Sequence, residues 1–305
     1  MTITLTEATA IEAVDTHVYS TNFKSEWCVG SVPHGGIVTA VFLRVAATHF
    51  RTTLAAQNQP HTITVHLEFL RRTQEGPATL TVRDVKLGRQ TSTVHITLSQ
   101  DGREEVVGYL TNSNLDVEQG PTFNTGWSLQ PSPPPADLPR LAAEGSDANW
   151  AEQKKTQTFR KVYNNFHLYF PRNGQVMPSM ADEWLRLTSG ERFTNESLGV
   201  VSDLFPLINE EMMRAQNGGK RNGPRPVMWY PTVALNLDIK KALPPEGVEW
   251  LFVRVHAKSA KNGRDDLEVV ILDEAGDIVA LSHHVVLMLS AERNTAARRK
   301  EPSKI

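Results

Sequence analysis

The sequence predicts an α+β fold in which two modules each consist of an antiparallel β-sheet wrapped around a long central helix. One observation behind this is an apolar run with helical spacing near the N-terminus, followed by several stretches with the alternation of strands. The other is that the same order of patterns returns in the second half of the chain. With 305 residues, the chain is long enough for two modules that each bury a core.

The helix of the first module is predicted over the stretch "PHGGIVTAVFLRVAATHF", residues 33–50. Its apolar residues recur at the spacing i, i+1, i+4 and i+5, which places on one helix face Ile37, Val38, Val41, Phe42, Val45 and Ala46. Ala40 and Leu43 widen this face until the helix is apolar nearly all round. A helix of that kind must be enclosed by other parts of the fold.

Strands follow the helix directly. The stretch "TITVHLEFLRRT", residues 62–73, alternates apolar and polar residues with the period of two that a half-buried strand requires. Residues 78–100 contain two more stretches of strand type, and residues 103–113 contain another after an Asp101-Gly102 turn. The order predicts one buried helix followed by an antiparallel meander.

The second half repeats this order. An opening strand is predicted in "VYNNFHLYF" and a long helix in "ESLGVVSDLFPLINEEMM", residues 196–213, and four strand patterns then lead to residue 289. Residues 62–72 align with 232–242, and residues 85–98 align with 260–273. The alignment sets His66 against Asn236. We interpret the match as an internal duplication at the scale of a domain.

The predicted organisation has four parts. An N-terminal module covers residues 1–114, and a linker rich in Pro and Gly covers residues 115–154. A C-terminal module covers residues 155–290, and residues 291–305 form a charged tail.

Composition narrows the class of protein. The formal net charge of −2 does not suggest a nucleic-acid partner, and no stretch of about 18 apolar residues predicts a membrane span. Cys28 is the single cysteine, so no disulfide within the chain is possible, and we interpret it as a packing residue. The last three residues, Ser303-Lys304-Ile305, resemble a peroxisomal address, so a cytoplasmic or peroxisomal location is expected.

The stretches "VPHGGIVTAVFLR", "LGVVSDLFP", "PTVALNLD" and the strands from residue 249 onward resemble the double-hotdog fold of acyl-CoA thioesterase II and its thioesterase-like relatives. The resemblance covers about residues 15–115 and 160–290. It implies hydrolysis of a fatty-acyl or polyketide-type thioester of CoA or of a carrier protein. It implies no cofactor and no metal, and it is compatible with a monomer or a homodimer.

The resemblance also implies an Asp, a Ser or Thr, and a Gln around an attacking water. Carried over to this chain, the Asp position falls on Ala234, the hydroxyl position falls on Lys258 or Ser259, and the Gln position falls on His284. An alanine cannot activate water, so the chain departs from the pattern at that position.

Four residues are therefore considered as replacements or additions. His284 is the expected general base, with Asn236 and Asp203 as polar residues that can face the same cavity, and His66 as the counterpart of Asn236. His34, Gly35 and Gly36 precede the first helix, and the backbone N–H groups at its start can bind the oxyanion of a thioester. The alternative is that the two glycines only allow close packing.

Other chemistries have little support in the sequence. It contains no Walker loop, no Gly-x-Gly-x-x-Gly after a strand, no Gly-x-Ser-x-Gly and no His/Cys spacing typical of metal sites. Two alternatives to hydrolysis stay open. The first is a non-hydrolytic hotdog enzyme, such as a cyclase, dehydratase or isomerase. The second is a non-catalytic protein that binds an acyl group or lipid.

Overall fold

The computed structural model describes residues 3–154, 156–205, 208–216 and 227–296. Its helices are α1 (Leu5–Ala8), α2 (Gly35–Arg51), α3 (Leu138–Glu144), α4 (Leu198–Val201), α5 (Ile208–Gln216) and α6 (Glu292–Thr295). Its strands are β1 (Ile11–Asp15), β2 (Val18–Phe23), β3 (Cys28–Val29), β4 (Val32–Pro33), β5 (His61–Phe69), β6 (Gly76–Lys86), β7 (Ser92–Gln100), β8 (Arg103–Ser113), β9 (Trp150–Glu152), β10 (Phe166–Pro171), β11 (Met180–Leu187), β12 (Met228–Trp229), β13 (Thr232–Ile239), β14 (Leu251–His256), β15 (Ala260–Lys261), β16 (Arg264–Leu272), β17 (Ile278–Leu287) and β18 (Leu289–Ser290).

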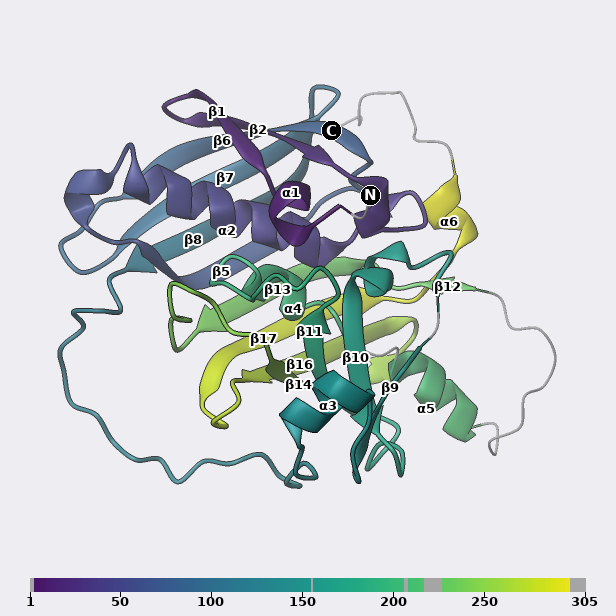
Figure 1. Cartoon of the computed structure of the whole chain (residues 1–305). Helices are drawn as coiled ribbons and strands as arrows, with labels where there is room; N and C mark the ends of the chain where they lie inside the picture. The colour runs from purple at the N-terminus through teal and green to yellow at the C-terminus, as the bar shows by residue number, and fades with distance from the viewer. Residues whose placement is uncertain (1–2, 155, 206–207, 217–226, 297–305) are drawn as a thin grey trace.

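One large antiparallel sheet runs through both modules (Figure 1). Its strand order is β1-β2-β6-β7-β8-β5-β13-β17-β16-β14-β11-β10-β9, so each module contributes a contiguous half. The halves meet where β5 pairs antiparallel with β13, and His66 lies directly opposite Asn236 at that seam. The two residues that the internal alignment matched are therefore cross-strand neighbours.

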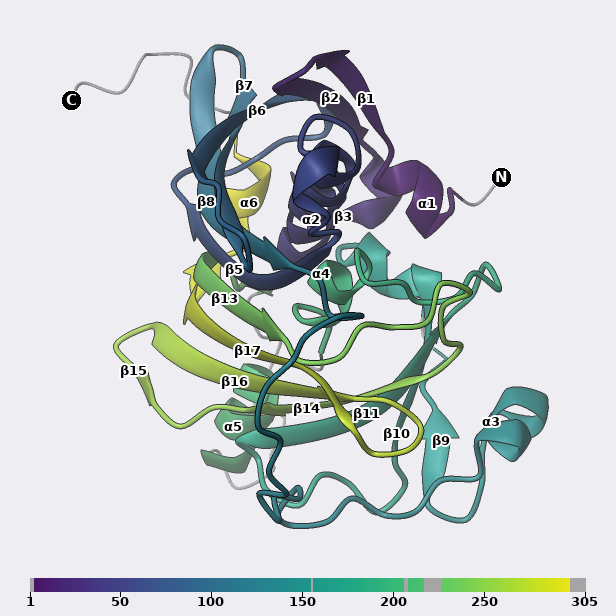
Figure 2. The same ribbon diagram turned by 90° about the vertical axis from the view of Figure 1, so that its left-hand side faces the viewer.

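The helix predicted over residues 33–50 is confirmed as α2. His34 caps it, because its ring accepts a hydrogen bond from the Gly36 N–H, and thirteen of its residues are buried. The strands of the first module curve around α2, with the α1 segment on its remaining side (Figure 2). This enclosure explains why the helix can be apolar nearly all round.

The long helix predicted in the second module is wrong. The described structure contains only the four-residue α4 and, separately, the nine-residue α5 that begins at Ile208. Pro206 lies between them in the sequence. A proline removes a backbone donor and disfavours helical backbone at the preceding residue. The apolar residues therefore keep their helical spacing in the sequence, although the segment is not one continuous helix.

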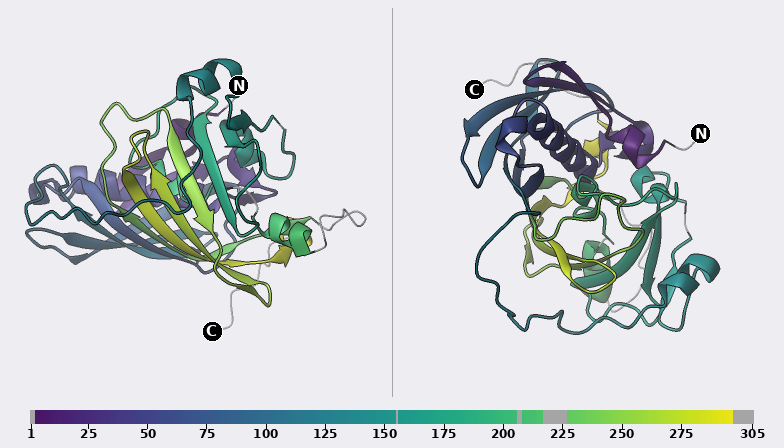
Figure 3. Two further views of the ribbon diagram at one scale, coloured as in Figure 1. Left: turned by 90° about the horizontal axis from the view of Figure 1, so that it is seen from below. Right: turned by 60° about the vertical axis from the view of Figure 1, so that its left-hand side comes forward.

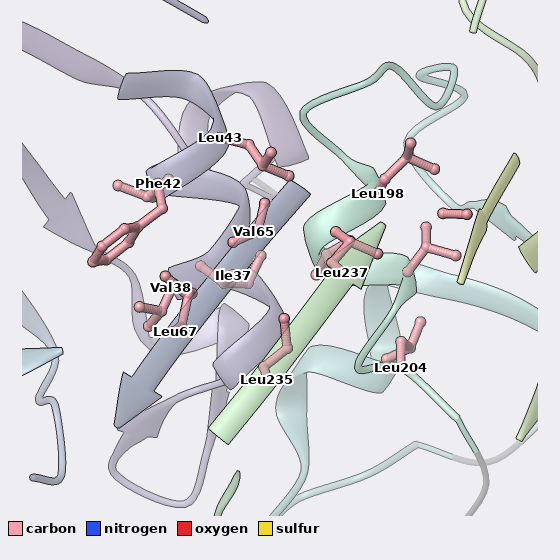
Figure 4. Packing of buried hydrophobic residues seen from close by; sticks show 14 of the residues in the cluster. Ile37, Val38, Phe42, Leu43, Val65, Leu67, Leu198, Leu204, Leu235 and Leu237 are labelled. Carbon is pink, nitrogen blue, oxygen red and sulfur yellow. The ribbon is translucent and has the colours of Figure 1, made fainter. Parts of the chain in front are cut away.

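The two central helices pack closely because glycines lie at the contact. A Cβ added at Gly36 would lie 2.8 Å from the Val200 Cα, and one added at Gly199 would lie 2.5 Å from the Ala40 backbone nitrogen. Apolar side chains of both modules surround this contact (Figure 4), including Ile37, Leu67, Leu198, Leu204 and Leu235. The seam is therefore part of one continuous core.

The segment predicted as a linker, residues 115–154, contains both irregular and regular structure. After β8 the chain runs along the outside of the second module (Figure 3). It then forms α3 and β9, and β9 pairs with β10 in the main sheet. Leu141 and Trp150 are fully buried there against Tyr169 and Trp250, in a second apolar cluster.

The expected peroxisomal address and the expected absence of a membrane span concern the tail and the helices. Ser303-Lys304-Ile305 lie outside the described residues. In the part of the chain that is described, no helix has the length and apolar character that crossing a membrane requires.

Candidate active site

A cavity of about 270 Å³ opens at the seam between the modules. It is bounded by the start of α2, the end of β5, the chain after α4, the start of α5 and the stretch that leads into β13. Its wall is largely aromatic and aliphatic, with Phe69, Tyr163, Phe205, Trp229 and Tyr230 among the lining residues. Such a wall suits an apolar group of the ligand.

Asp203 supplies a carboxylate to this cavity. It follows α4 directly, and its Oδ2 points at the start of α2, where a Cβ on Gly35 would lie only 2.7 Å away. The absence of a side chain at Gly35 thus admits the carboxylate. The positive end of the α2 dipole favours a negative charge at this position.

Thr232 and His284 lie on either side of the same carboxylate oxygen. Thr232 Oγ1 donates a hydrogen bond to Asp203 Oδ1 at 3.4 Å, and His284 Nδ1 lies 3.6 Å from that oxygen. Thr232 reaches the inner face of the sheet because the register of β13 with β17 shifts between Thr232 and Ala234. Without this bulge, the alternation along the strand would send its side chain to the outer face.

His284 is neutral at physiological pH. Its ring is fully buried on β17, and burial lowers its pKa to about 4, although the nearby Asp203 charge acts in the opposite direction. Ser282 Oγ donates to the Asn236 carbonyl at 2.6 Å and lies 2.9 Å from His284 Nε2. The Ser282 proton is thus used, so Nε2 carries the ring proton, and Nδ1 faces Asp203 as an acceptor.

His34 approaches Asp203 from the other module. Its Nδ1 lies 3.6 Å from Asp203 Oδ2 and accepts the Gly36 N–H at 3.2 Å. Burial lowers the pKa of His34, and Asp203 opposes this effect. Since the Gly36 N–H is already bonded, only Gly35 of the two predicted amides stays available. At the first position of α2, its N–H has no partner within the helix.

The arrangement brings a carboxylate, a hydroxyl and a helix N-terminus to one side of an apolar cavity. A carboxylate with an adjacent hydroxyl can bind a water molecule and accept its proton, and an unpaired N–H at a helix start can stabilise a developing oxyanion. Of the residues predicted for the site, the structure brings together Asp203, His284, His34 and Gly35. Gly36 lies beside them as a packing residue.

The other predicted site residues lie elsewhere. Asn236 and His66 are on the outer face of the sheet, where His66 Nδ1 contacts Asn236 Oδ1 at 2.6 Å. Lys258 and Ser259 are exposed beyond the end of β14, and Lys258 pairs with Glu268 at 2.7 Å. None of these four lines the cavity. The cavity therefore gives no support to their expected contacts with the thioester.

The Asp position expected at Ala234 is also corrected by the geometry. Ala234 is paired with Glu68 and Val285 on the outer face, because it follows the bulge of β13. An alanine there has no bearing on the cavity, and Asp203 supplies the carboxylate from another element. Thr232, which the sequence reasoning missed, supplies the hydroxyl. A Thr at the start of a strand signals no role by itself, since only the bulge turns it inward.

A group able to hold a metal lies far from this cavity, at the other end of α2. His17, His49 and Asp84 have ligand atoms within 4.8 Å of one another. The two imidazoles contact the two oxygens of Asp84 at 3.3 Å and 3.0 Å, and their other ring nitrogens contact Thr16 and Tyr19 hydroxyls. Within the described residues, every one of these atoms has a hydrogen-bond partner.

A smaller cavity of about 120 Å³ also lies near that end of α2. Ala47 and Arg51 of α2 line it, together with Glu196 just before α4. Its position between the far ends of the two central helices corresponds to that of the larger cavity, but its lining residues include no Asp.

Comparison with known proteins agrees with this fold. Residues 23–113 match the acyl-CoA thioesterase N-terminal domain, and residues 135–288 match the acyl-CoA thioesterase C-terminal domain. The thioesterase-like protein TwmA of Talaromyces wortmannii is 38% identical over 330 residues, which cover 96% of this chain and 94% of the relative. The chain belongs to the acyl-CoA thioesterase family, and it is a thioesterase-like enzyme.

Solved structures share the fold. A hotdog protein of unknown function from Alicyclobacillus acidocaldarius superposes with a TM-score of 0.74 at 19% identity, covering 94% of this chain and 98% of the other. An acyl-CoA thioesterase II from Mycobacterium marinum superposes with a TM-score of 0.65 at 17% identity, covering 94% and 98%. The predicted double-hotdog architecture is therefore confirmed.

Proposed function

We propose that the protein hydrolyses an acyl thioester with a water molecule activated by Asp203. The single observation that supports this most directly is the position of the Asp203 carboxylate. It faces an apolar cavity at the start of α2, and Thr232 Oγ1 is bonded to one of its oxygens. A base, a hydroxyl that orients water and a groove for an acyl chain are the groups that hydrolysis requires.

In the first step, water bound between Asp203 and Thr232 attacks the thioester carbonyl carbon. Asp203 takes one proton of the water, and the new C–O bond produces a tetrahedral intermediate. Its oxyanion accepts a hydrogen bond from the Gly35 N–H, at the positive end of the α2 dipole. In the second step the C–S bond breaks, and Asp203 returns the proton to the departing thiolate. The products are a carboxylic acid and a thiol.

His34 and His284 act as positioning residues in this proposal. Both imidazoles are neutral and buried against Asp203, one from each module. Their rings pack against the carboxylate from two sides and limit the space in which it can move. Holding the carboxylate in place beside the cavity is what orients it toward a bound water.

The test is thiol release from CoA thioesters by the purified protein, followed with a thiol-reactive dye. Asp203→Asn keeps the size of the side chain and removes the base, so the rate should fall by about 100-fold or more. Asp238→Asn is the matched control, since Asp238 is on the outer face of β13 and pairs with Lys240. Equal rates for wild type and Asp203→Asn would contradict the proposal.

One observation favours a second candidate. His34 and Asp203 form an imidazole–carboxylate pair across the seam, beside the same cavity. Such a pair can exchange protons with a hydroxylated or carbonyl-containing acyl group, as cyclisation, dehydration or isomerisation requires. In that case a product would form without thiol release, and mass spectrometry of the reaction mixture would detect it. A ligand bound but unchanged would instead support a non-catalytic binder.

The carrier, the assembly and the location also belong to this proposal. We expect a CoA or carrier-protein thioester as substrate, and a monomer or homodimer, which light scattering after gel filtration would distinguish. For the cytoplasmic or peroxisomal location, a fluorescent fusion with and without Ser303-Lys304-Ile305 is the direct test.

A further inference from the structure

A second group of polar side chains, separate from Asp203, lies at the cavity wall and directly behind it. Asn209 belongs to the first turn of α5, Tyr230 lies two residues before Thr232, and Asp265 lies on β16. Asn209 is 5% exposed and Asp265 is 1% exposed. Within the described residues, no hydrogen bond of good geometry reaches Asn209 Oδ1, the Tyr230 hydroxyl or either carboxylate oxygen of Asp265, although the Asn209 amide lies near enough to Asp265 to lower its pKa.

These three residues are neighbours at the cavity wall. Asn209 and Tyr230 line it directly. Asp265 points to the same inner face, because Val286 lies directly across from it on β17 and Val286 lines the cavity. Burial raises the pKa of Asp265, and the nearby Asn209 amide acts in the opposite direction. Three elements distant in sequence therefore bring unpaired polar atoms to one place.

The presence of three polar side chains in an otherwise apolar cavity wall requires an explanation. Buried polar atoms without partners are costly, and Leu or Phe at these positions would suit an alkyl chain better. Their presence indicates that a polar group of the ligand supplies the missing hydrogen bonds.

We propose that Asn209, Tyr230 and Asp265 form a subsite that binds a hydroxyl group on the acyl part of the substrate. This inference rests on the proposed thioesterase function, and it narrows the substrate class to hydroxylated acyl thioesters.

The hydrogen-bonding capacities of the three residues explain the choice of a hydroxyl. Asp265 and Asn209 Oδ1 offer acceptors, and the Tyr230 hydroxyl offers a donor. A ligand hydroxyl can donate to one of the acceptors and accept from Tyr230 at the same time. A ketone cannot donate, and an unsubstituted alkyl chain would leave all the polar atoms unpaired.

The experiment compares an unsubstituted acyl-CoA with analogues of the same length whose hydroxyl is moved from the third carbon to the last. Affinity is measured by calorimetry with Asp203→Asn, which keeps the thioester intact. Hydrolysis is measured as kcat/KM with the wild type. At least one hydroxylated analogue should bind, and react, about tenfold better than the unsubstituted thioester, because a site built for hydrogen bonds rejects ligands that lack them.

Tyr230→Phe removes one hydroxyl and little else. It should lower the preference for the hydroxylated analogue by about two- to tenfold. The matched control is Tyr109→Phe on β8, whose side chain is 46% exposed. This control should leave the preference unchanged. Asp265→Asn, which keeps shape while exchanging one acceptor for a donor, should change the preference as well.

The outcomes for the two proposals are distinguishable. If no thioester is hydrolysed, the proposed function fails, and the affinities alone still decide the subsite. If hydrolysis occurs but every analogue binds and reacts no better than the unsubstituted thioester, the subsite is overturned and its polar atoms bind only water. An unchanged preference in Tyr230→Phe, or no measurable affinity for any thioester, would overturn it too.

Discussion

The Asp203 carboxylate lies between two buried imidazoles, with His34 Nδ1 at 3.6 Å from one oxygen and His284 Nδ1 at 3.6 Å from the other. The two histidines come from different modules, so the seam itself determines the surroundings of the carboxylate. The glycines at the start of α2 and in α4 make this seam compact.

Acid should destabilise the protein through His284. Its pKa is about 4 in the folded protein and 6.5 in the unfolded chain. Between these values the unfolded state binds a proton that the folded state does not, so the free energy of unfolding falls as pH falls, by about 3 kcal/mol in total. Urea unfolding at several pH values checks this. His284→Gln should flatten the slope between about pH 6.5 and pH 4, and an unchanged slope would contradict the assignment.

Substituting the two adjacent glycines, Gly35 and Gly36, should affect different properties of the protein. In Gly36→Ala the new Cβ would meet the Val200 backbone at 2.8 Å, so the free energy of unfolding should fall by about 1–3 kcal/mol. In Gly35→Ala it would meet the Asp203 carboxylate at 2.7 Å, which a rotation of that side chain relieves. Thermal unfolding and thiol release, measured for both variants, should assign a stability loss mainly to Gly36→Ala and an activity loss to Gly35→Ala.

Glu183 should weaken the fold at neutral and alkaline pH. It is fully buried on β11, its carboxylate has no hydrogen-bond partner in the described part of the chain, and burial raises its pKa well above 4.5. The unfolded chain therefore loses a proton that the folded chain keeps, and stability falls as pH rises. Glu183→Gln should add about 1–3 kcal/mol at about pH 8 and less at about pH 5, by urea unfolding.

The neighbouring Asp182 provides the contrast. It lies on the other face of β11, where Arg254 donates to both of its oxygens at 2.6 Å and 2.7 Å. Asp182→Asn should destabilise the protein by about 3–5 kcal/mol, since it leaves a buried guanidinium without a counter-charge. A gain in stability from this variant would mean that the burial of the two faces is misassigned.

The outer-face pair at the seam should have no role in catalysis. His66 and Asn236 contact each other across β5 and β13 and are exposed. His66→Ala and Asn236→Ala should each leave the rate of thiol release within about twofold of wild type, and should lower stability by at most about 1 kcal/mol. A large loss of activity in either variant would contradict the orientation of these strands.

Much of the fold could be predicted because burial follows simple periods. The helix over residues 33–50 and the alternating strands on either side of the seam have patterns that match their environment. The second helix could not be predicted from its apolar residues alone. Val201, Leu204 and Ile208 keep the helical spacing i, i+3, i+7, but the sequence places Pro206 within it, and a proline disfavours a continuous helix.

The site was predictable in part for a related reason. Asp203 and His284 were recognisable as polar residues in apolar stretches. Thr232 was not, because a bulge beside it reverses the face that its side chain occupies. The same reversal explains why Ala234 was misassigned, since alternation counted along a regular strand has no means of detecting an extra residue.

The two halves that meet where β5 pairs with β13 belong to one polypeptide chain, so each residue of the site is encoded once. In a symmetric dimer of identical subunits, any substitution alters two sites together. Here a substitution changes the larger cavity and leaves its smaller counterpart at the other end of α2 untouched. The two ends of the molecule can therefore diverge independently, and selection can change the chemistry of one without altering the other.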